Sequence, residues 1–277
     1  MQMDRWTSEM KAIVFPALEE VGGGIEIDNS NGPELVYFPE LIRQGQIEQG
    51  GDNTIDIDET CGVRVASFPK LEVADVIEID DNDSLECVDL SSLKSTGSRL
   101  NLDDNVFLKE VRTPNLETVG DGLDWSDSLT LTEVNLPKLT SVGDTINFSG
   151  SIGLKKISAP LLETVPGDVD LGDVPSLDSV DFGSLTSIRG LTISQSQLSD
   201  LNAFSNLSGE SGISLSLLHN AKLTSADALA TAVSNGVFTN GHICDNPLLA
   251  SLPSSFSSLN PVPVVCAADE PPCDCSF

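Results

Sequence analysis

The chain has 277 residues, of which 43 are acidic and 14 are basic, so its formal net charge is −29. This excess of acid argues against nucleic-acid binding, because phosphate backbones attract basic surfaces. It fits an extracellular or high-salt setting, a basic partner, or the solubility of a large exposed sheet. No apolar run approaches the length that spans a membrane, so no transmembrane segment is expected.

A short phrase that places a leucine two residues after Pro, Ser or Gly recurs along most of the chain. Earlier copies open at Pro16, Pro39 and Pro69, and a degenerate copy opens at Ser205. Five consecutive copies keep a period of 23 residues, and their leucines are Leu93, Leu116, Leu139, Leu162 and Leu185. A constant period of this size predicts a solenoid, in which stacked repeats bury a continuous core.

Each repeat contains three short extended pieces separated by turn residues. We therefore predict a mainly all-β fold, a right-handed parallel β-helix or leucine-rich-repeat-like solenoid of about nine coils. Hairpins of a β-sandwich would not keep a corner at constant spacing. Three apolar columns should lie inside. They contain Ile27, Ile57, Ile79, Leu102, Trp125, Phe148, Leu171 and Ile193; Met10, Val63, Leu85, Leu108, Leu131, Leu154 and Leu177; and Ile13, Val36, Ala66, Val88, Val111, Val134, Ile157 and Val180.

In chain order, residues 1–9 are expected to form a lead-in without the apolar middle of a signal peptide. Either Trp6 and its neighbours cap the stack, or upstream sequence has been removed. The solenoid is predicted over 10–225. The copy opened at Pro39 carries a polar surplus, 44–53, that should loop out as a binding loop or a tolerated insertion.

Residues 226–277 are predicted to form a C-terminal cap held by disulfides. A short helix is expected over 226–232, ending before Gly236. Residues 245–253 resemble a last leucine-rich turn, and the tail from Pro261 is rich in Pro and Cys. A solenoid exposes an apolar end unless it is capped.

The six cysteines form an even set, which favours disulfides and therefore secretion over zinc binding or free thiols. We expect Cys61 to pair with Cys87, and the four late cysteines to pair among themselves. The disulfide candidates are Cys61, Cys87, Cys244, Cys266, Cys273 and Cys275. Three sequons make glycosylation candidates, Asn82, Asn147 and Asn206, and Asn147 should point outward from its strand.

An outward row of polar residues is predicted between the inward positions of the strands, with a parallel row at the bends. The outward row is Glu26, Asp56, Glu78, Asn101, Asp124, Asn147, Asp170 and Thr192, and the bend row is Asp28, Asp58, Asp80 and Asp103. The carboxylates could bind a basic partner or calcium, or simply form bends. The candidate acidic residues are Glu26, Asp56, Glu78, Asp80, Asp124 and Asp170, and no defined metal or cofactor site is assigned.

No Ser-His-Asp set, phosphate loop or metal motif is present in the sequence, so an enzyme is not expected. Parallel β-helices do include polysaccharide-cleaving enzymes that use carboxylates. That remains the less favoured alternative.

The stretches Pro114–Leu123 and Pro137–Ile146 carry the clearest form of the repeat. Over about residues 10–215, the chain resembles receptor L-domains and fungal GPI-anchored cell-wall proteins. Bacterial surface-antigen leucine-rich repeats are the second choice. The resemblance implies a noncatalytic extracellular protein that recognises a protein or polysaccharide at a cell surface or wall. The excess of acid adds the expectation that the partner is basic. The alternative is a structural subunit of an extracellular assembly or filament, which would self-associate.

Overall fold

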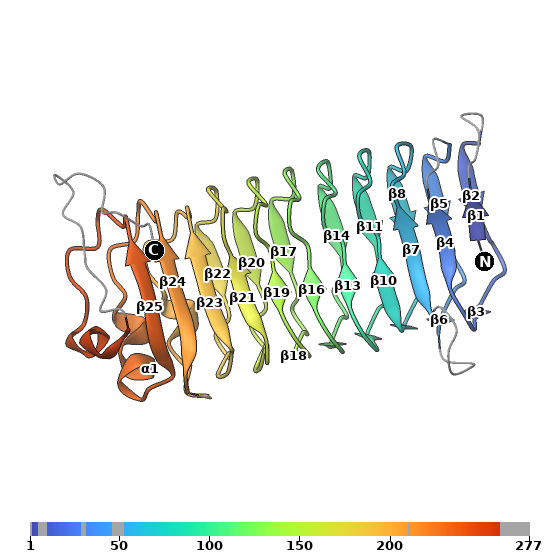
Figure 1. Cartoon of the computed structure of the whole chain (residues 1–277). Coiled ribbons are helices and arrows are strands. Elements are labelled where there is room, and N and C mark those ends of the chain that lie inside the picture. Colours follow the sequence, from blue (N-terminus) through green and yellow to red (C-terminus); the bar gives the residue numbers. More distant parts are fainter. Residues whose placement is uncertain (1, 5–9, 29–31, 46–52, 210, 261–277) are drawn as a thin grey trace.

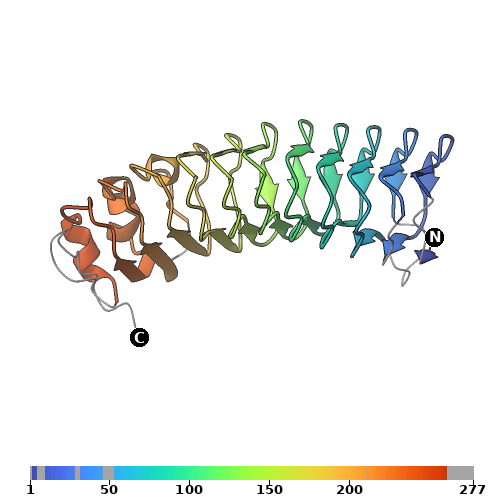
Figure 2. The same ribbon diagram turned by 90° about the horizontal axis from the view of Figure 1, so that it is seen from above.

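The computed structural model describes residues 2–4, 10–28, 32–45, 53–209 and 211–260. Successive coils stack side by side in chain order, so the molecule is an elongated rod (Figure 1). Seen from above, the rod curves gently toward its C-terminal coils (Figure 2). All strand pairs are parallel, which confirms the predicted all-β solenoid and excludes antiparallel hairpins from the described sheets.

Sheet A runs the whole length of the rod and contains eleven strands. In order they are β1 (Gln2–Asp4), β4 (Ile25–Asp28), β7 (Thr54–Asp58), β10 (Val76–Glu78), β13 (Leu100–Asn101), β16 (Leu123–Asp124), β19 (Ile146–Asn147), β21 (Asp168–Leu171), β23 (Gly190–Ser194), β24 (Ile213–Leu218) and β25 (Phe238–Cys244).

Three shorter sheets form the other sides of the coils. Sheet B contains β2 (Ala12–Val14), β5 (Leu35–Tyr37), β8 (Val65–Ser67), β11 (Cys87–Asp89) and β14 (Glu110–Arg112), and sheet D contains β17 (Glu133–Asn135), β20 (Lys156–Ser158) and β22 (Ser179–Asp181). Sheet C contains β3 (Glu20–Val21), β6 (Arg43–Gln44), β9 (Val73–Ala74), β12 (Ser95–Thr96), β15 (Thr118–Val119) and β18 (Ser141–Val142).

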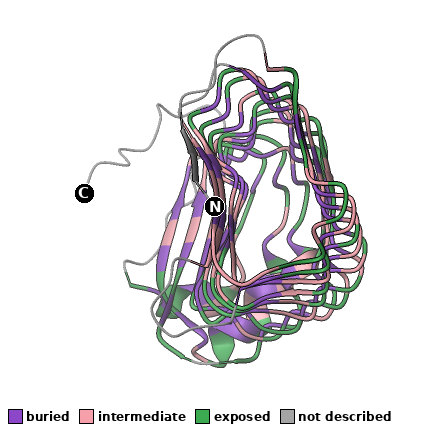
Figure 3. Ribbon diagram, turned by 90° about the vertical axis from the view of Figure 1, so that its right-hand side faces the viewer, coloured by how far each residue is buried: buried purple, intermediate pink, exposed green. Residues whose placement is uncertain are grey.

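The core is built from the apolar columns predicted by the repeat. Ile27 faces Ile57 across neighbouring strands, and both are fully buried. Ile13, Val36 and Ala66 are likewise in register and buried, while Met10, Val111 and Val180 are partly buried against the same core. Figure 3, a view along the rod, shows buried and exposed positions recurring at the same places in successive coils. One coil buries these side chains only against its neighbours, which is why the period is strict.

Helix is confined to short segments near the C-terminal end. They are η1 (Asn202–Phe204), η2 (Asp227–Leu229), α1 (Ala230–Ser234) and η3 (Ser254–Ser258). The helix expected at 226–232 therefore forms, and the backbone N–H of Asp227 donates to Ser225 Oγ at 3.0 Å. Gly236 follows with a φ of 75°, a conformation that suits glycine at a helix end.

Sheet A continues past residue 225, the boundary expected for the solenoid. Strand β25 pairs with β24 in parallel, with Leu217 opposite Ile243. These residues are 26 apart because the helical segment η2–α1 lies between the two strands, so the 23-residue period does not extend to them. Of the loop surplus predicted at 44–53, Gln44 is instead buried in β6, and residues 46–52 lie outside the described residues. Trp6 and the tail with Cys266, Cys273 and Cys275 also lie outside them.

Candidate functional site

The outward row predicted from the sequence lies in one register along sheet A; we call it the outer acidic row. Glu26 is opposite Asp56, and Asp56 is opposite Glu78. The alignment then continues through the pairs Glu78 and Asn101, Asn101 and Asp124, Asp124 and Asn147, Asn147 and Asp170, and Asp170 and Thr192. Neighbouring strands lie about 4.8 Å apart, so the row brings carboxylates of adjacent coils close together.

Part of this row also serves the bends that follow the strands. Asp124 Oδ1 accepts hydrogen bonds from the backbone N–H of Ser126 at 3.0 Å and from its hydroxyl at 2.6 Å. Asp170 accepts from the N–H of Gly172 at 2.9 Å. Asn147 Nδ2 donates to Asp124 Oδ2 at 3.0 Å, so this amide binds the carboxylate on the neighbouring strand. The turn-forming role and a surface charge therefore coexist in the same side chains.

The bend row adds carboxyl groups to the same face, but its setting disfavours their charged form. The pKa of Asp80 is raised to about 7, first by burial and then by the carboxylates of Asp103, Glu78 and Asp56. Burial also raises the pKa of Asp58, with Asp28 beside it, and of Asp103. The Oδ1 atoms of Asp28 and Asp58 are shielded from solvent and have no hydrogen-bond partner within the described part of the chain. Carboxylates in this position are costly to ionise.

A third column of acids stands at the corner beyond the bend row, where the backbone is left-handed. Asp81, Asp104, Asp127 and Asp173 have φ values of 53°, 51°, 50° and 53°, and all four are exposed. Asp is among the few residues that tolerate this conformation, so the local fold explains the residue type. Together the three columns form an acidic face over β4, β7, β10, β13 and β16, which Asp170 and Asp173 extend to the coil of β21.

The described carboxylates of the acidic face are spread along the rod rather than gathered around one point. Among the described residues, no group of three or more His, Cys, Asp or Glu side chains is placed to hold a metal ion. Arg99 forms an ion pair with Glu78 and brings a positive charge to this part of the face. The arrangement suits a diffuse cationic partner better than a coordinated ion.

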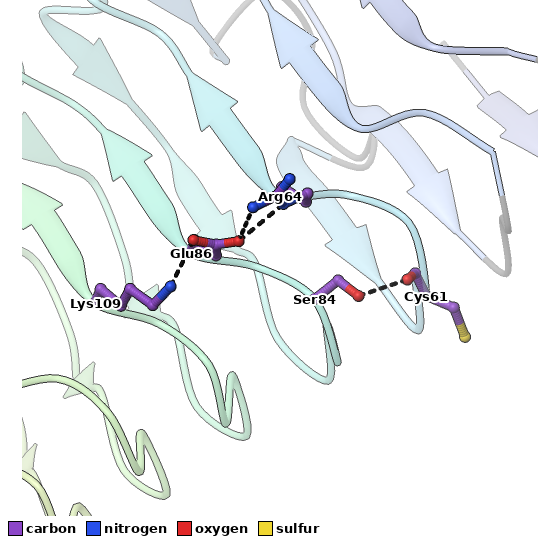
Figure 4. A network of polar contacts seen from close by, with 5 residues as sticks. All are labelled: Cys61, Arg64, Ser84, Glu86 and Lys109. Atoms are coloured by element: carbon purple, nitrogen blue, oxygen red, sulfur yellow. Dashed lines mark hydrogen bonds and ion pairs between the residues drawn. The ribbon is translucent and has the colours of Figure 1, made fainter.

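Charges elsewhere on the rod alternate in sign. Just before the strands of sheet B, Arg64 binds Glu86, and Lys109 binds the other oxygen of Glu86 at 2.6 Å (Figure 4). Lys11 and Glu34 form a similar pair in the first coils. These exposed pairs neutralise one another, whereas the outer acidic row has three consecutive acids, Glu26, Asp56 and Glu78, before acids and amides alternate.

The C-terminal half of sheet A is hollowed by a groove whose described lining holds one acid and one base. A groove of about 910 Å³ is lined by hydroxyl-bearing residues of β23, β24 and the segments that lead into the strands, including Thr164, Ser187, Thr192 and Ser214. Arg189 and Asp168 also line it. Among the described lining residues, Asp168 is the single carboxylate, whereas glycoside hydrolysis ordinarily uses a pair.

The predicted Cys61–Cys87 disulfide is wrong, because both residues are free thiols. Cys61 lies in a bend above Ser84, whose hydroxyl donates to the Cys61 carbonyl oxygen at 2.7 Å (Figure 4). Cys87 instead lies in β11, opposite Val65. The two cysteines therefore occupy different positions along their coils. Cys244 is disulfide-bonded.

Asn82 is wrong as a glycosylation candidate, because it is fully buried. Its Nδ2 donates to the carbonyl oxygens of Ile57 and Asp80 at 2.7 and 2.8 Å. It belongs to an inner polar column that sequence reasoning missed. The column contains Thr60, Asn82, Asn105, Ser128, Ser151, Ser196, Asn220 and Asn246, all buried. The constant spacing of Asn82, Asn105, Ser128 and Ser151 could have revealed it.

The other two glycosylation candidates remain predictions. Asn147 is half-buried in the outer acidic row, and its Oδ1 accepts from the N–H of Ser149 at 3.0 Å. Asn206 is exposed, and its Nδ2 donates to the Gly183 carbonyl oxygen at 2.8 Å.

Comparison with known proteins adds little to this geometry. No family model matches the chain. No curated protein matches it. A chain in a solved structure of the Toll–Spatzle complex from Drosophila aligns at 16% identity, over 83% of this chain and 40% of that chain, with a TM-score of 0.27. At that score, no property of the complex is transferred to this protein. In the described residues, no helix has the length and apolarity to cross a bilayer.

Proposed function

We propose that this solenoid is a noncatalytic recognition protein whose acidic face on sheet A binds a basic protein segment at a cell surface. The observation that carries the proposal is the register of Glu26, Asp56 and Glu78, which stacks carboxylates on consecutive strands. Two such charges about 5 Å apart repel by about 0.8 kcal/mol in water. A basic partner relieves that repulsion and is steered to the face by its field.

The extracellular location rests on two supports. The disulfide at Cys244 fits an oxidising compartment, since disulfides are rare in reducing cytosol. The repeat phrase, clearest in Pro114–Leu123, resembles that of receptor L-domains and fungal wall proteins. This resemblance is why we propose a protein of that extracellular type. The predicted Cys61–Cys87 disulfide would have been a third support, but both residues are free thiols.

Two other functions fit the molecule less well. A filament built by packing acidic faces together would set a chain of net charge −29 against itself. A polysaccharide-cleaving enzyme would place a second carboxylate across the groove from Asp168, and the described lining holds none. A groove lined by hydroxyls remains compatible with polysaccharide as an additional ligand.

The proposal is tested by binding a fluorescently labelled twelve-residue oligolysine to two variants with equal charge. One removes five carboxylates from the row, through Glu26→Gln, Asp56→Asn, Glu78→Gln, Asp124→Asn and Asp170→Asn. The control removes five exposed carboxylates elsewhere, through Glu19→Gln, Glu117→Gln, Glu133→Gln, Glu163→Gln and Asp178→Asn. Both variants lower the net negative charge equally, so any difference between them reports position.

We expect the row variant to bind at least about tenfold more weakly than the control variant at physiological salt, about 1.4 kcal/mol in binding free energy. The row variant should also show the shallower dependence on salt. Equal weakening in the two variants would mean that oligolysine senses only the net charge, and the acidic face would lose its proposed role.

A further inference from the structure

An exposed apolar ridge runs along the corner beside the acidic face. It consists of Val106, Phe107, Leu129, Ile152 and Pro175, which occupy the same bend in four successive coils, and we call it the bend ridge. Phe107 is 54% exposed, Leu129 39% and Ile152 48%. Contiguous exposed apolar side chains of this kind mark interaction sites, whereas single ones need no explanation.

The local fold does not account for these residue types. The bends are closed by backbone hydrogen bonds from Leu108 to Asn105 at 2.9 Å and from Leu154 to Ser151 at 3.0 Å, which place the ridge residues at the turn corners. Turn corners favour Pro, Asp, Ser and Gly. Pro175 obeys this preference, and the earlier coils have Cys61 and Asp83 at the equivalent place. Large apolar side chains begin at Val106, so the apolar character belongs to one stretch of the rod.

The bends of Leu129 and Ile152 touch, and acids border the ridge. A Cβ atom on Gly153 would lie 2.5 Å from the Leu129 carbonyl oxygen, so these bends are in close contact. The left-handed residues Asp104, Asp127 and Asp173 lie two residues before the ridge residues Val106, Leu129 and Pro175 in the same coils. A side chain on Gly150 would collide with the carboxylate of Asp127, which therefore lies over the next coil. The pKa of Asp104 is raised by burial and then by the carboxylates of Asp127 and Asp81.

We propose that the bend ridge and its flanking aspartates bind a basic amphipathic α-helix of a protein partner, lying along the rod. Four coils at about 4.8 Å spacing span about 14 Å. A helix rises about 1.5 Å per residue, so side chains at i, i+3 or i+4, and i+7 recur about every 5 Å and match the coils. A strand laid along the rod would present same-face side chains about every 6.7 Å and would lose register.

The charges distinguish this occupant from others. An anionic membrane is repelled by the aspartates that border the ridge. A second copy of this chain would bring two aspartate columns together across the contact. A helix with lysine or arginine beside its apolar stripe places cations against Asp104, Asp127 and Asp173 while covering Phe107, Leu129 and Ile152.

The test uses a labelled eighteen-residue helical peptide of leucine and lysine with one apolar face, and a scrambled peptide of the same composition. Binding is measured by fluorescence anisotropy on the full chain. The ridge variant is Leu129→Ser with Ile152→Ser. The matched control is Val14→Ser with Leu161→Ser, two apolar residues of 45% and 49% exposure on other parts of the rod. Circular dichroism verifies that both variants keep their strand content.

We expect the ridge variant to bind the helical peptide about tenfold more weakly and the control variant to stay within about twofold, since tenfold is about 1.4 kcal/mol. The scrambled peptide should bind the unmodified protein as weakly as the helical peptide binds the ridge variant. Asp104→Asn with Asp127→Asn should weaken binding and flatten its salt dependence.

Equal binding of the two peptides, or equal losses in the ridge and control variants, would overturn the proposal. If the unmodified protein sediments as a dimer and the ridge variant as a monomer, the ridge binds a second copy of this chain instead. Binding of the unmodified protein to vesicles of anionic lipid through the ridge would likewise contradict it. If the row variant loses oligolysine binding but still binds the helical peptide more tightly than the scrambled one, the outer acidic row and the bend ridge are separate binding sites.

Discussion

Two polar columns repeat once per coil, and they differ in what surrounds them. In the inner polar column, Asn105 Nδ2 donates to the carbonyl oxygens of Ile79 and Leu102 at 2.5 and 2.8 Å, and its Oδ1 accepts from the N–H of Asn82 at 3.2 Å. In the outer acidic row, the neighbours across the strands are often other carboxylates, as for Asp56 and Glu78. Asn105 is satisfied within the fold, whereas the outer acidic row presents carboxylates of consecutive strands to the surface. A polar repeat is therefore structural or functional according to its surroundings.

The largest expected effect comes from breaking the inner column. Asn105→Ala should destabilise the protein by about 2 to 4 kcal/mol, because it leaves two buried carbonyl oxygens and the N–H of Asn82 without their partner. Asn101→Ala, four residues earlier in the outer acidic row, should cost less than about 1 kcal/mol. Urea unfolding of both variants measures the difference. Equal losses would remove the distinction between the columns.

A smaller change is expected on the acidic face, where removing the charge of Asp80 should increase the stability of the protein in a pH-dependent way. The folded pKa of Asp80 is about 7, above the ordinary aspartate value, so between about pH 4 and 7 the folded state binds more protons than the unfolded state. Stability contributed by this group falls as pH rises through that window and is lost above pH 7. Because Asp80 is half exposed, solvent screening reduces the effect to about 1 kcal/mol.

Asp80→Asn should therefore raise stability at pH 7.5 and leave it nearly unchanged at pH 4. Urea unfolding at the two pH values measures this, with Asp178→Asn, on an exposed and distant acid, as the control. If the stability gained by Asp80→Asn instead increases as the pH falls, the result contradicts the raised pKa assigned to Asp80 in the folded state.

The smallest expected effect is that of calcium. The outer carboxylates are spread along a row rather than gathered, and no described group of three is placed to bind a metal ion. Thermal unfolding in calcium chloride and in sodium chloride at matched ionic strength should therefore give overlapping curves, as screening alone predicts. A clear rise of the unfolding temperature in calcium would reveal a coordinated ion and would replace the basic partner with a metal.

Periodicity predicted most of the fold, because a core position repeated every 23 residues must lie inside. It placed the buried columns of Ile27 and Ile13, and it placed the outer acidic row strand by strand. It missed β25, since the helical segment before that strand changes the spacing. It mispaired Cys61 and Cys87 because nearness in sequence ignored that they sit at different points of the coil. It assigned Asn82 to the surface because a sequon says nothing about burial.

The most direct test of the proposed recognition role is to map where a basic ligand binds. Hydrogen exchange of the whole chain is measured with and without a twelve-residue oligolysine at physiological salt. Protection should concentrate in β4, β7, β10, β13 and β16, which carry the acidic face, and should be weak in β23, β24 and β25. Protection spread evenly along the rod, or concentrated beside the alternating charges of sheet B, would contradict the acidic face as the recognition surface.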